Sequence, residues 1–317
     1  RMRGNIVIEV RGMDVEKWRS EIETAAKGRR FFIEPDGAGD PSVRFAVVWK
    51  QRPSSLSKFP NLKVIFSLGA GVDHIFQDPE VPDVPIVRIV SEDLTMRMSE
   101  YIVWQVLDHH RMGPKYRRQQ RNHIWLEDRA QPSADQVTVG LLGLGVLGSD
   151  AARKLAMMGF NVTGWSRTPR YSQNITCFCG DEQLPWFLAT VDILVCLLPL
   201  TPQTKGFLNK SLFDRMKKGG TFGAPVLINA GRGGLQNELD ILTALDSGVL
   251  SAVSLDVFNT EPLPMVSPFW DHPNVSITPH AAASSAPDQL VGPIVAQMEA
   301  FERGEPLRNL VDRNAQY

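Results

Sequence analysis

Three polar side chains with complementary chemistry follow apolar runs in the second half of the chain. Arg232 lies in LINAGRG, Glu261 follows LDVFNT, and His280 ends ITPH. The carboxyl ends of parallel strands share one edge of a sheet, so the three side chains are expected at that edge. The planar fork of an arginine suits a carboxylate with an adjacent carbonyl, and a histidine titrates near neutral pH. Together they suit the reduction of a 2-oxo acid.

Each of the three residues has a role in that reaction. As hydride reaches the carbonyl carbon, charge builds on the oxygen, and His280 can donate the proton that this oxygen needs. Glu261 favours the imidazolium and fixes its orientation, while Arg232 anchors the substrate carboxylate and helps to polarise the carbonyl. Taken singly, the arginine is an ordinary surface residue and the histidine a hydrogen-bonded structural one. The hypothesis therefore depends on all three residues together.

A glycine-rich stretch in the middle of the chain predicts a place for the hydride donor. The spacing G-x-G-x-x-G lies between an apolar run over 137–142, which predicts a strand, and an apolar pattern with helical spacing. The glycines allow a tight turn, close approach to a pyrophosphate and close packing of helix on strand. The pyrophosphate then lies on the helix N-terminus, where amides are unpaired. The predicted cofactor contacts in this stretch are Gly143, Leu144, Gly145, Val146, Leu147 and Gly148.

The next predicted strand ends in GWSRTPR, which indicates the type of dinucleotide. NAD-binding folds place an acidic residue here for the ribose 2′-hydroxyl, and this stretch has none. A hydroxyl and two guanidinium groups can hold a 2′-phosphate instead. We therefore predict NADP(H), in preference to NAD(H), bound by Ser166, Arg167, Thr168 and Arg170. The alternative is that both arginines are solvated surface charges.

Composition excludes several other classes of protein. With 317 residues, 43% hydrophobic and 22% charged, the chain is typical of a soluble globular protein with room for two domains. A net charge of -1 without a basic block argues against nucleic acid. Cys177, Cys179 and Cys196 lack the spacing of a zinc site, so we expect no metal and a reducing compartment. No apolar run is long enough for a signal peptide or a membrane span, and we expect a cytoplasmic protein.

The order of predicted elements indicates two α/β domains. Before the glycine stretch, short β-rich runs alternate with helical or polar segments, which is typical of a small parallel α/β domain; these runs are 5–10, 30–33, 45–49, 63–67 and 85–89. The pattern from Ser91 to about Arg118 predicts one long helix that connects the domains. After it, six strands predict a doubly wound sheet; they are 137–142, 161–165, 193–197, 226–230, 251–255 and 275–278. The helix over 287–302 is expected to pack back against the first domain.

Several motifs in a fixed order identify a family resemblance. They are FSLGAGVDHI, EYIVWQVL, GLLGLGVLGS, GWSRT, CLLPLTPQT, INAGRG, ALDSG, LDVFNTEPLP and TPHAAA. On these motifs the chain resembles the D-isomer-specific 2-hydroxyacid dehydrogenases over nearly its whole length, and within them the glyoxylate/hydroxypyruvate reductase A branch. The resemblance implies two doubly wound parallel-sheet domains, with a Rossmann nucleotide-binding domain (104–284) inserted into a flavodoxin-like substrate domain (1–103 and 285–317).

The resemblance also implies functional residues. It gives Arg232, Glu261 and His280 the catalytic roles argued above. Trp49 is similar to a residue that lines the small-substrate pocket in this family. The amides of the loop Gly69, Ala70, Gly71 and Val72 are implied to bind the substrate carboxylate, and Arg232 and His280 are the other implied substrate contacts. From its residues alone, that glycine loop is either an anion-binding turn or a simple bend. The further implied cofactor contacts are Leu198, Pro199, Thr201, Ala230, Gly231, Arg232, Asp256 and His280. Family members are generally dimers, so a homodimer is implied.

The sequence departs from the family pattern in two places. The stretch KGGTFGAP (218–225) is longer and richer in glycine than is usual, and Ala281 stands where a bulkier aliphatic residue is common. Neither change removes a catalytic group.

The first hypothesis is NADPH-dependent reduction of glyoxylate to glycolate and of hydroxypyruvate to D-glycerate. Two alternatives are the same reaction on a bulkier 2-oxo acid and a corepressor-like nucleotide sensor, against which the complete set of Arg, Glu and His weighs.

Overall fold

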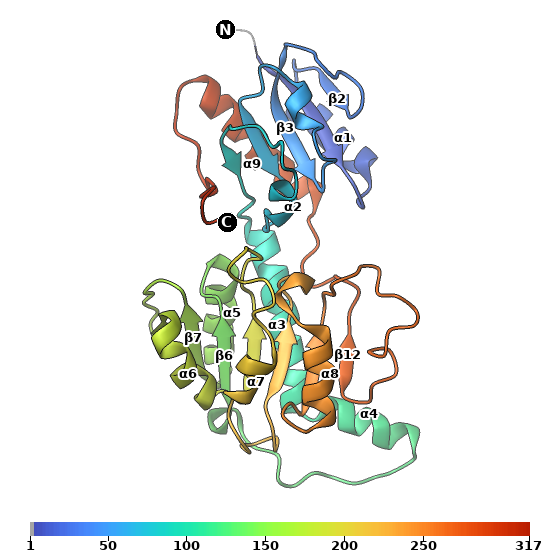
Figure 1. Cartoon of the computed structure of the whole chain (residues 1–317), viewed down its shortest axis with the longest axis vertical. Coiled ribbons are helices and arrows are strands. Elements are labelled where there is room, and N and C mark those ends of the chain that lie inside the picture. Colours follow the sequence, from blue (N-terminus) through green and yellow to red (C-terminus); the bar gives the residue numbers. More distant parts are fainter. Residues whose placement is uncertain (1–2) are drawn as a thin grey trace. The chain divides into compact units, whose positions relative to one another are not determined.

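The structure of the protein is a computed structural model that describes residues 3–317 and forms two compact units (Figure 1). Unit 1 contains the described residues up to Leu94 together with Ser285–Tyr317, and unit 2 contains Thr95–Ser284. The contacts divide the chain after Leu94, whereas the predicted boundary lies after residue 103. The reason is that Met98, Tyr101 and Ile102 already pack in a hydrophobic core of unit 2.

Unit 1 is a five-stranded parallel sheet with the strand order β2-β1-β3-β4-β5, which is the flavodoxin-like order. Its strands are β1 (Asn5–Val10), β2 (Phe31–Ile33), β3 (Val43–Trp49), β4 (Val64–Ser67) and β5 (Ile86–Val87). Its helices are α1 (Val15–Ala25), α2 (Asp73–Phe76) and α9 (Pro287–Glu302), with a short 3₁₀ turn at Leu56–Lys58. Helix α9 contacts α1, and Glu302 at its end pairs with the buried Arg29 at 2.7 Å. The predicted return of the last helix to the first domain is confirmed.

Unit 2 is a seven-stranded parallel sheet with the order β12-β11-β10-β9-β6-β7-β8, a Rossmann arrangement. Its strands are β6 (Thr138–Leu142), β7 (Asn161–Ser166), β8 (Thr176–Cys179), β9 (Ile193–Cys196), β10 (Val226–Asn229), β11 (Ala252–Leu255) and β12 (Val275–Ile277). Helices α6 (Gly180–Thr190), α7 (Lys210–Asp214) and α8 (Glu238–Asp246) cover one face of this sheet. Helices α3 (Glu92–His110) and α5 (Val146–Met157) pack into a second core on the other face.

Two predictions about unit 2 were wrong. The predicted helix from Ser91 to about Arg118 is broken, because α3 ends at His110 and α4 spans Gly113–Arg121, with Met112 at φ +60° between them. Pro114 explains the break, since proline has no N–H for the carbonyl four residues earlier and its ring collides with that carbonyl. The predicted sheet lacked β8, a four-residue edge strand that is only partly buried. Among the described residues, no helix is long and apolar enough to cross a membrane.

Candidate active site

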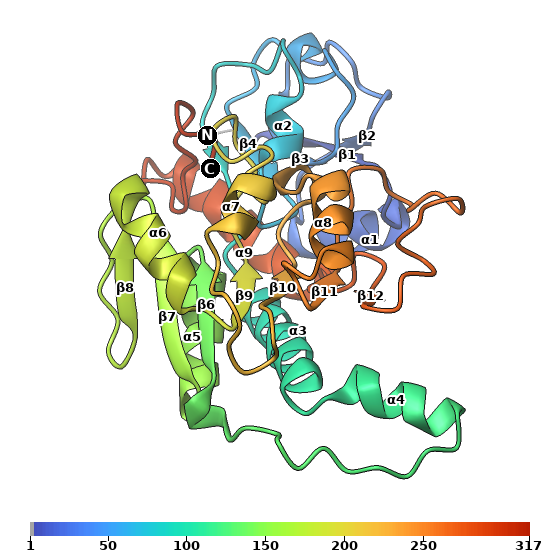
Figure 2. The ribbon, with the colours of Figure 1, turned by 60° about the horizontal axis from the view of Figure 1, so that its bottom comes forward.

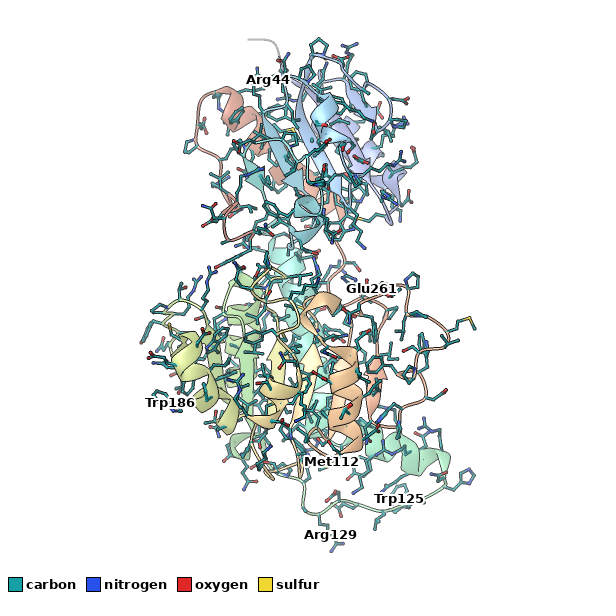
Figure 3. All side chains as sticks on the ribbon, in the orientation of Figure 1. Arg44, Met112, Trp125, Arg129, Trp186 and Glu261 are labelled. Atoms are coloured by element: carbon teal, nitrogen blue, oxygen red, sulfur yellow. The ribbon has the colours of Figure 1, made fainter. Side chains whose placement is uncertain are left out.

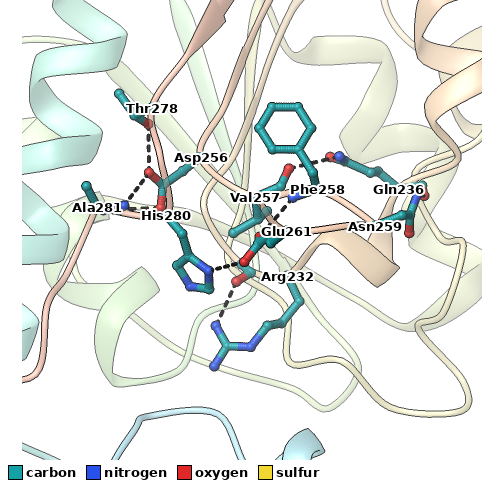
Figure 4. A network of polar contacts seen from close by, with 12 residues as sticks. Arg232, Gln236, Asp256, Val257, Phe258, Asn259, Glu261, Thr278, His280 and Ala281 are labelled. Carbon is teal, nitrogen blue, oxygen red and sulfur yellow. Dashed lines mark hydrogen bonds and ion pairs between the residues drawn. The ribbon is translucent and has the colours of Figure 1, made fainter. Parts of the chain in front are cut away.

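Figure 4 shows Arg232, Glu261 and His280 gathered at the carboxyl edge of the unit 2 sheet, after β10, β11 and β12 respectively. The Nδ1 atom of His280 lies 2.7 Å from Oε2 of Glu261. The second carboxylate oxygen, Oε1, accepts a hydrogen bond from the backbone N–H of Phe258 at 3.0 Å. The carboxylate is therefore fixed at both oxygens, and it orients the imidazole through one nitrogen.

The backbone at His280 adopts a left-handed conformation, with φ of +51°. This conformation costs a non-glycine residue on the order of 1 kcal/mol and is found at functional sites. The buried carboxylate of Asp256 compensates by accepting hydrogen bonds from Thr278 Oγ1 (2.6 Å) and from the amides of Ala281 (2.8 Å) and Ala282 (3.1 Å). Asp256 therefore braces the turn that presents His280.

A tyrosine from α3 extends this brace. The hydroxyl of Tyr101 lies 2.7 Å from Oγ1 of Thr278, and Tyr101 is buried. Burial raises the pKa of Tyr101, because the charged phenolate loses its solvent. The hydroxyl therefore stays protonated and available for hydrogen bonding to the turn. Sequence reasoning did not identify Tyr101, although a tyrosine within the apolar run EYIVW is a signal of a buried hydroxyl that needs a partner.

The turn that carries Arg232 is held by the buried amide of Asn229, the last residue of β10. Oδ1 of Asn229 accepts from the N–H of Gly231 at 3.0 Å, and Nδ2 donates to the carbonyl of Arg232 at 3.2 Å. On the other side, Gly233 lies against the next loop, and a Cβ there would be 1.9 Å from the carbonyl oxygen of Phe258. The guanidinium of Arg232 donates to the carbonyl of Gly231 at 2.9 Å. The backbone of Arg232 is thus fixed from both sides.

The glycine stretch forms the turn between β6 and α5. Gly143 has φ +100°, and a Cβ on Gly148 would lie 1.9 Å from the carbonyl oxygen of Gly143, so helix and strand approach closely there. A Cβ on Gly145 would meet no atom within 4 Å, and Gly145 caps α5 without a side-chain hydrogen bond. The space beside Gly145, at the N-terminus of this helix, is therefore open, which fits a pyrophosphate. Of the predicted contacts here, Leu144 has its side chain in the core.

The residues predicted to hold a 2′-phosphate follow β7. Arg167, Thr168 and Arg170 are exposed, whereas Ser166 is 7% exposed and donates to the carbonyl of Thr168 at 2.7 Å. The hydroxyl of Ser166 is therefore used within the turn, and the two guanidinium groups carry the positive charge. This arrangement fits a 2′-phosphate on the outer side of the turn.

The segment after β9 is a turn closed by its own hydroxyl groups. The amide of Thr201 donates to Oγ1 of Thr204 at 2.8 Å, and this hydroxyl donates to the carbonyl of Pro199 at 2.6 Å. Leu198 and Ala230 are buried at the ends of β9 and β10. These predicted cofactor contacts lie at the same sheet edge as the glycine stretch.

The predicted substrate residues of unit 1 lie together at the ends of β3 and β4. The ring of Trp49 packs against the buried His74 in a tilted arrangement, with centroids 4.4 Å apart, and a Cβ on Gly69 would lie 2.1 Å from that indole. Oγ of Ser67 lies 3.1 Å from Nε2 of His74 and donates to the carbonyl of Gly71 at 3.3 Å. The loop 69–72 is thus held in one shape against Trp49. Within residues 3–317, no cluster of His, Cys, Asp and Glu could hold a metal ion.

Comparison with known proteins agrees with this fold. Residues 103–282 match the family described as D-isomer specific 2-hydroxyacid dehydrogenase, NAD binding domain. The glyoxylate/hydroxypyruvate reductase A of Yersinia enterocolitica is 41% identical over 97% of this chain and 98% of its own length. The solved structure of an NADPH-dependent glyoxylate/hydroxypyruvate reductase from Sinorhizobium meliloti, in complex with NADP and sulfate, is 47% identical, with a TM-score of 0.93 over 99% of this chain and 100% of that one.

A further solved structure, the D-isomer specific 2-hydroxyacid dehydrogenase of Xanthobacter autotrophicus in complex with NADPH and MES, gives the same result. It is 38% identical, with a TM-score of 0.93 over 99% of this chain and 100% of its own. The predicted family and the predicted pair of parallel-sheet domains are confirmed. The chain belongs to the D-isomer-specific 2-hydroxyacid dehydrogenases.

Proposed function

We propose that this enzyme reduces small 2-oxo acids with NADPH, converting glyoxylate to glycolate and hydroxypyruvate to D-glycerate. The observation that carries the proposal is the His280–Glu261 pair, 2.7 Å apart, beside Arg232 and at the same sheet edge as an open glycine turn. The names of the relatives from Yersinia and Sinorhizobium support this choice of substrates. A sensor protein would not require an oriented acid and an anion-binding arginine together.

The residues of unit 2 fit a bound dinucleotide phosphate. The amides of 145–148 would hold the pyrophosphate, and Arg167 and Arg170 the 2′-phosphate. Bound there, NADPH supplies the hydride for the carbonyl carbon. The other steps of the reaction belong to side chains of the chain itself.

His280 donates the proton. Its Nδ1 is engaged by Glu261, so Nε2 is the atom that delivers the proton to the substrate oxygen as charge develops there. The carboxylate of Glu261 stabilises the imidazolium before transfer and keeps the ring from rotating after it. Arg232 binds the substrate carboxylate and the 2-oxo oxygen through its two-pronged guanidinium. The family resemblance assigns further contacts with the substrate carboxylate to the amides of the loop 69–72, and it assigns the limit on substrate size to Trp49; both lie in unit 1.

The test is steady-state oxidation of NADPH with a panel of 2-oxo acids, from glyoxylate to branched and aromatic ones. We expect the highest kcat/KM with glyoxylate and hydroxypyruvate. We also expect His280→Asn to lower kcat by at least about 100-fold, while NADPH binding changes little. Tight NADPH binding without turnover of any panel member would favour the sensor hypothesis, and full turnover by His280→Asn would place the proton donor elsewhere.

We further propose that two copies associate through unit 2. Helix α4 and the chain after it extend beyond the sheet of unit 2 (Figure 2) and carry the fully exposed Trp125 (Figure 3). Ile124 and Leu126, on either side of Trp125, are also more than half exposed, as is Trp104 on α3. Three consecutive large apolar side chains exposed in this way are unusual. Light scattering should give the mass of a dimer, and Trp125→Glu should shift it towards a monomer. A monomeric native protein would refute the proposal.

A further inference from the structure

The buried side chain of Gln236 has no part in the reaction described above. Gln236 is 2% exposed and lies between the 3₁₀ turn Gly233–Leu235 and α8. Its Oε1 accepts a hydrogen bond from Nδ2 of Asn229 at 2.9 Å, and its Nε2 donates to the carbonyl of Val257 at 2.9 Å and to Oε2 of Glu238 at 3.1 Å. Both amide hydrogens are therefore used, and every bond leads to a different segment.

These bonds connect the two turns that carry the reacting side chains, and Figure 4 shows the bond from Gln236 to the carbonyl of Val257. On one side, the amide of Asn229 that bonds to Gln236 also donates to the carbonyl of Arg232 at 3.2 Å. On the other side, Val257 directly precedes Phe258, whose N–H donates to Glu261 at 3.0 Å. Gln236 is thus the link between the backbone of Arg232 and the carboxylate that orients His280.

Two further contacts join the same turns. Nδ2 of Asn259 donates to the carbonyl of Gln236 at 3.2 Å, and the N–H of Asn259 donates to Oε2 of Glu238 at 3.3 Å. Gly233 fills the remaining space, since even a Cβ there would collide with the carbonyl of Phe258. The turns therefore have no freedom to slide past one another while these bonds are intact.

We propose that Gln236 is a positioning residue, which sets the spacing between Arg232 and the Glu261–His280 pair. The proposal rests on the proposed function, because it assumes that Arg232 binds the substrate and His280 protonates it. Loss of the link moves the anion anchor relative to the proton donor, and a misplacement of about 1 Å can cost about 100-fold in rate. The proposed pyrophosphate and 2′-phosphate contacts follow β6 and β7, outside the two turns that Gln236 joins, so we expect NADPH binding to change less than the binding and reduction of glyoxylate.

Gln236→Met tests this proposal, because methionine has nearly the same length and forms none of these hydrogen bonds. We expect kcat/KM for glyoxylate to fall about 10- to 100-fold, with a raised KM for glyoxylate and a lowered kcat. The KM for NADPH should stay within about twofold of the native value, a split that general loosening of the unit would not produce.

Gln236→Glu separates the two halves of the link. The glutamate keeps an acceptor for Asn229 and loses the donor for Val257, so we expect kcat to fall more than the KM for glyoxylate rises. Equal changes in both parameters would contradict the path through Val257.

The matched control is Asn5→Leu. Asn5 is also a buried amide that joins segments, accepting from the N–H of Arg30 at 2.9 Å and donating to Ser42 at 2.7 Å, but it begins β1 in unit 1. We expect it to lower the melting temperature without changing kcat or KM. If Gln236→Met behaves in the same way, the residue supports stability alone and the inference is wrong.

Two further variants keep the test decisive. Asn259→Ala removes an exposed side chain that bonds to Gln236, so it decides the question if Gln236→Met does not fold. We expect a smaller loss of kcat/KM for glyoxylate, again with little change in the KM for NADPH, and unchanged kinetics would refute the inference.

His280→Asn separates the two proposals. If it abolishes turnover and the Gln236 and Asn259 variants remain fully active, only the inference fails, whereas an active His280→Asn overturns the proposed function.

Discussion

Replacement of Glu261 by glutamine is the most direct test of the His280–Glu261 pair. The substitution keeps the shape of the side chain and its oxygen facing the N–H of Phe258, but it removes the negative charge 2.7 Å from Nδ1 of His280. A hydrogen bond to a charged group contributes about 1.5–3 kcal/mol. The side chains of His280 and Glu261 are 35% and 26% exposed, so solvent screening favours the lower part of this range.

The kinetic consequence follows from that energy. Each 1.36 kcal/mol lost in the transition state lowers the rate about tenfold, so a loss in the lower part of that range should lower kcat/KM for glyoxylate in Glu261→Gln about 10- to 40-fold. The KM for NADPH should change little, because Glu261 is not among the predicted cofactor contacts. Initial rates of NADPH absorbance loss, measured over a range of glyoxylate concentrations, give both parameters.

The protein contains a matched control for this experiment. His272 and Asp246 form a second histidine–carboxylate pair in unit 2, with Nε2 and Oδ1 3.2 Å apart. Asp246 is the last residue of α8 and is not part of the proposed site, so Asp246→Asn should leave kcat/KM within about twofold. Equal effects of the two substitutions, or a Glu261→Gln enzyme with native kcat/KM, would refute the role assigned to the pair.

Three other predictions concern the cofactor turn and the packing behind it. Arg167→Asp should reduce the ratio of kcat/KM with NADPH to that with NADH, and an unchanged ratio would contradict the assigned 2′-phosphate site. Gly148→Ala should weaken NADPH binding in a fluorescence titration, because its methyl group would lie 1.9 Å from the carbonyl oxygen of Gly143. Burial would raise the pKa of Asp150, but hydrogen bonds from Lys154, Ser99 and Arg153 lower it from 3.8 to about 2. Its stabilising effect is therefore complete above about pH 4 and lost as the pH falls towards 2, so the free energy of unfolding of Asp150→Asn should depend less on pH in that range.

The sheet framework was predictable from the sequence because parallel strands are buried on both faces. β9 and β10 are completely buried, and such strands are continuous apolar runs that pattern analysis detects. β8 escaped detection for the opposite reason, since an edge strand buries only part of its surface. Pro114 marks the break between α3 and α4, but the polar residues after the apolar stripe of α3 are compatible with a helix, so the pattern alone favours one continuous helix.

The candidate site was predictable only in part. Arg232, Glu261 and His280 stand out because their types and their places after strands suggest chemistry. Gln236 has no comparable signal, since a polar residue two positions before α8 is typical of an exposed loop. Its partner Val257 is 21 residues away in the sequence, and a hydrogen bond over that separation depends on how two turns pack. Such contacts follow from tertiary structure rather than from local pattern.

The register of the strands explains why the three reacting residues meet and why register alone is not sufficient. Asn229 pairs with Leu255 and Leu255 with Ile277, so the three strands end at one level and the residues after them leave the sheet side by side. The turns that follow differ in length, however. Each turn on its own would let the position of its reacting side chain vary by several ångströms. Buried polar groups remove that freedom: Asn229 and Gln236 hold the turn of Arg232, and Asp256 holds the turn of His280. Side chains that solvent can reach therefore carry the chemistry, while buried amides and a carboxylate set its geometry. Substitutions of these buried groups, which touch no substrate, should still change kcat and KM.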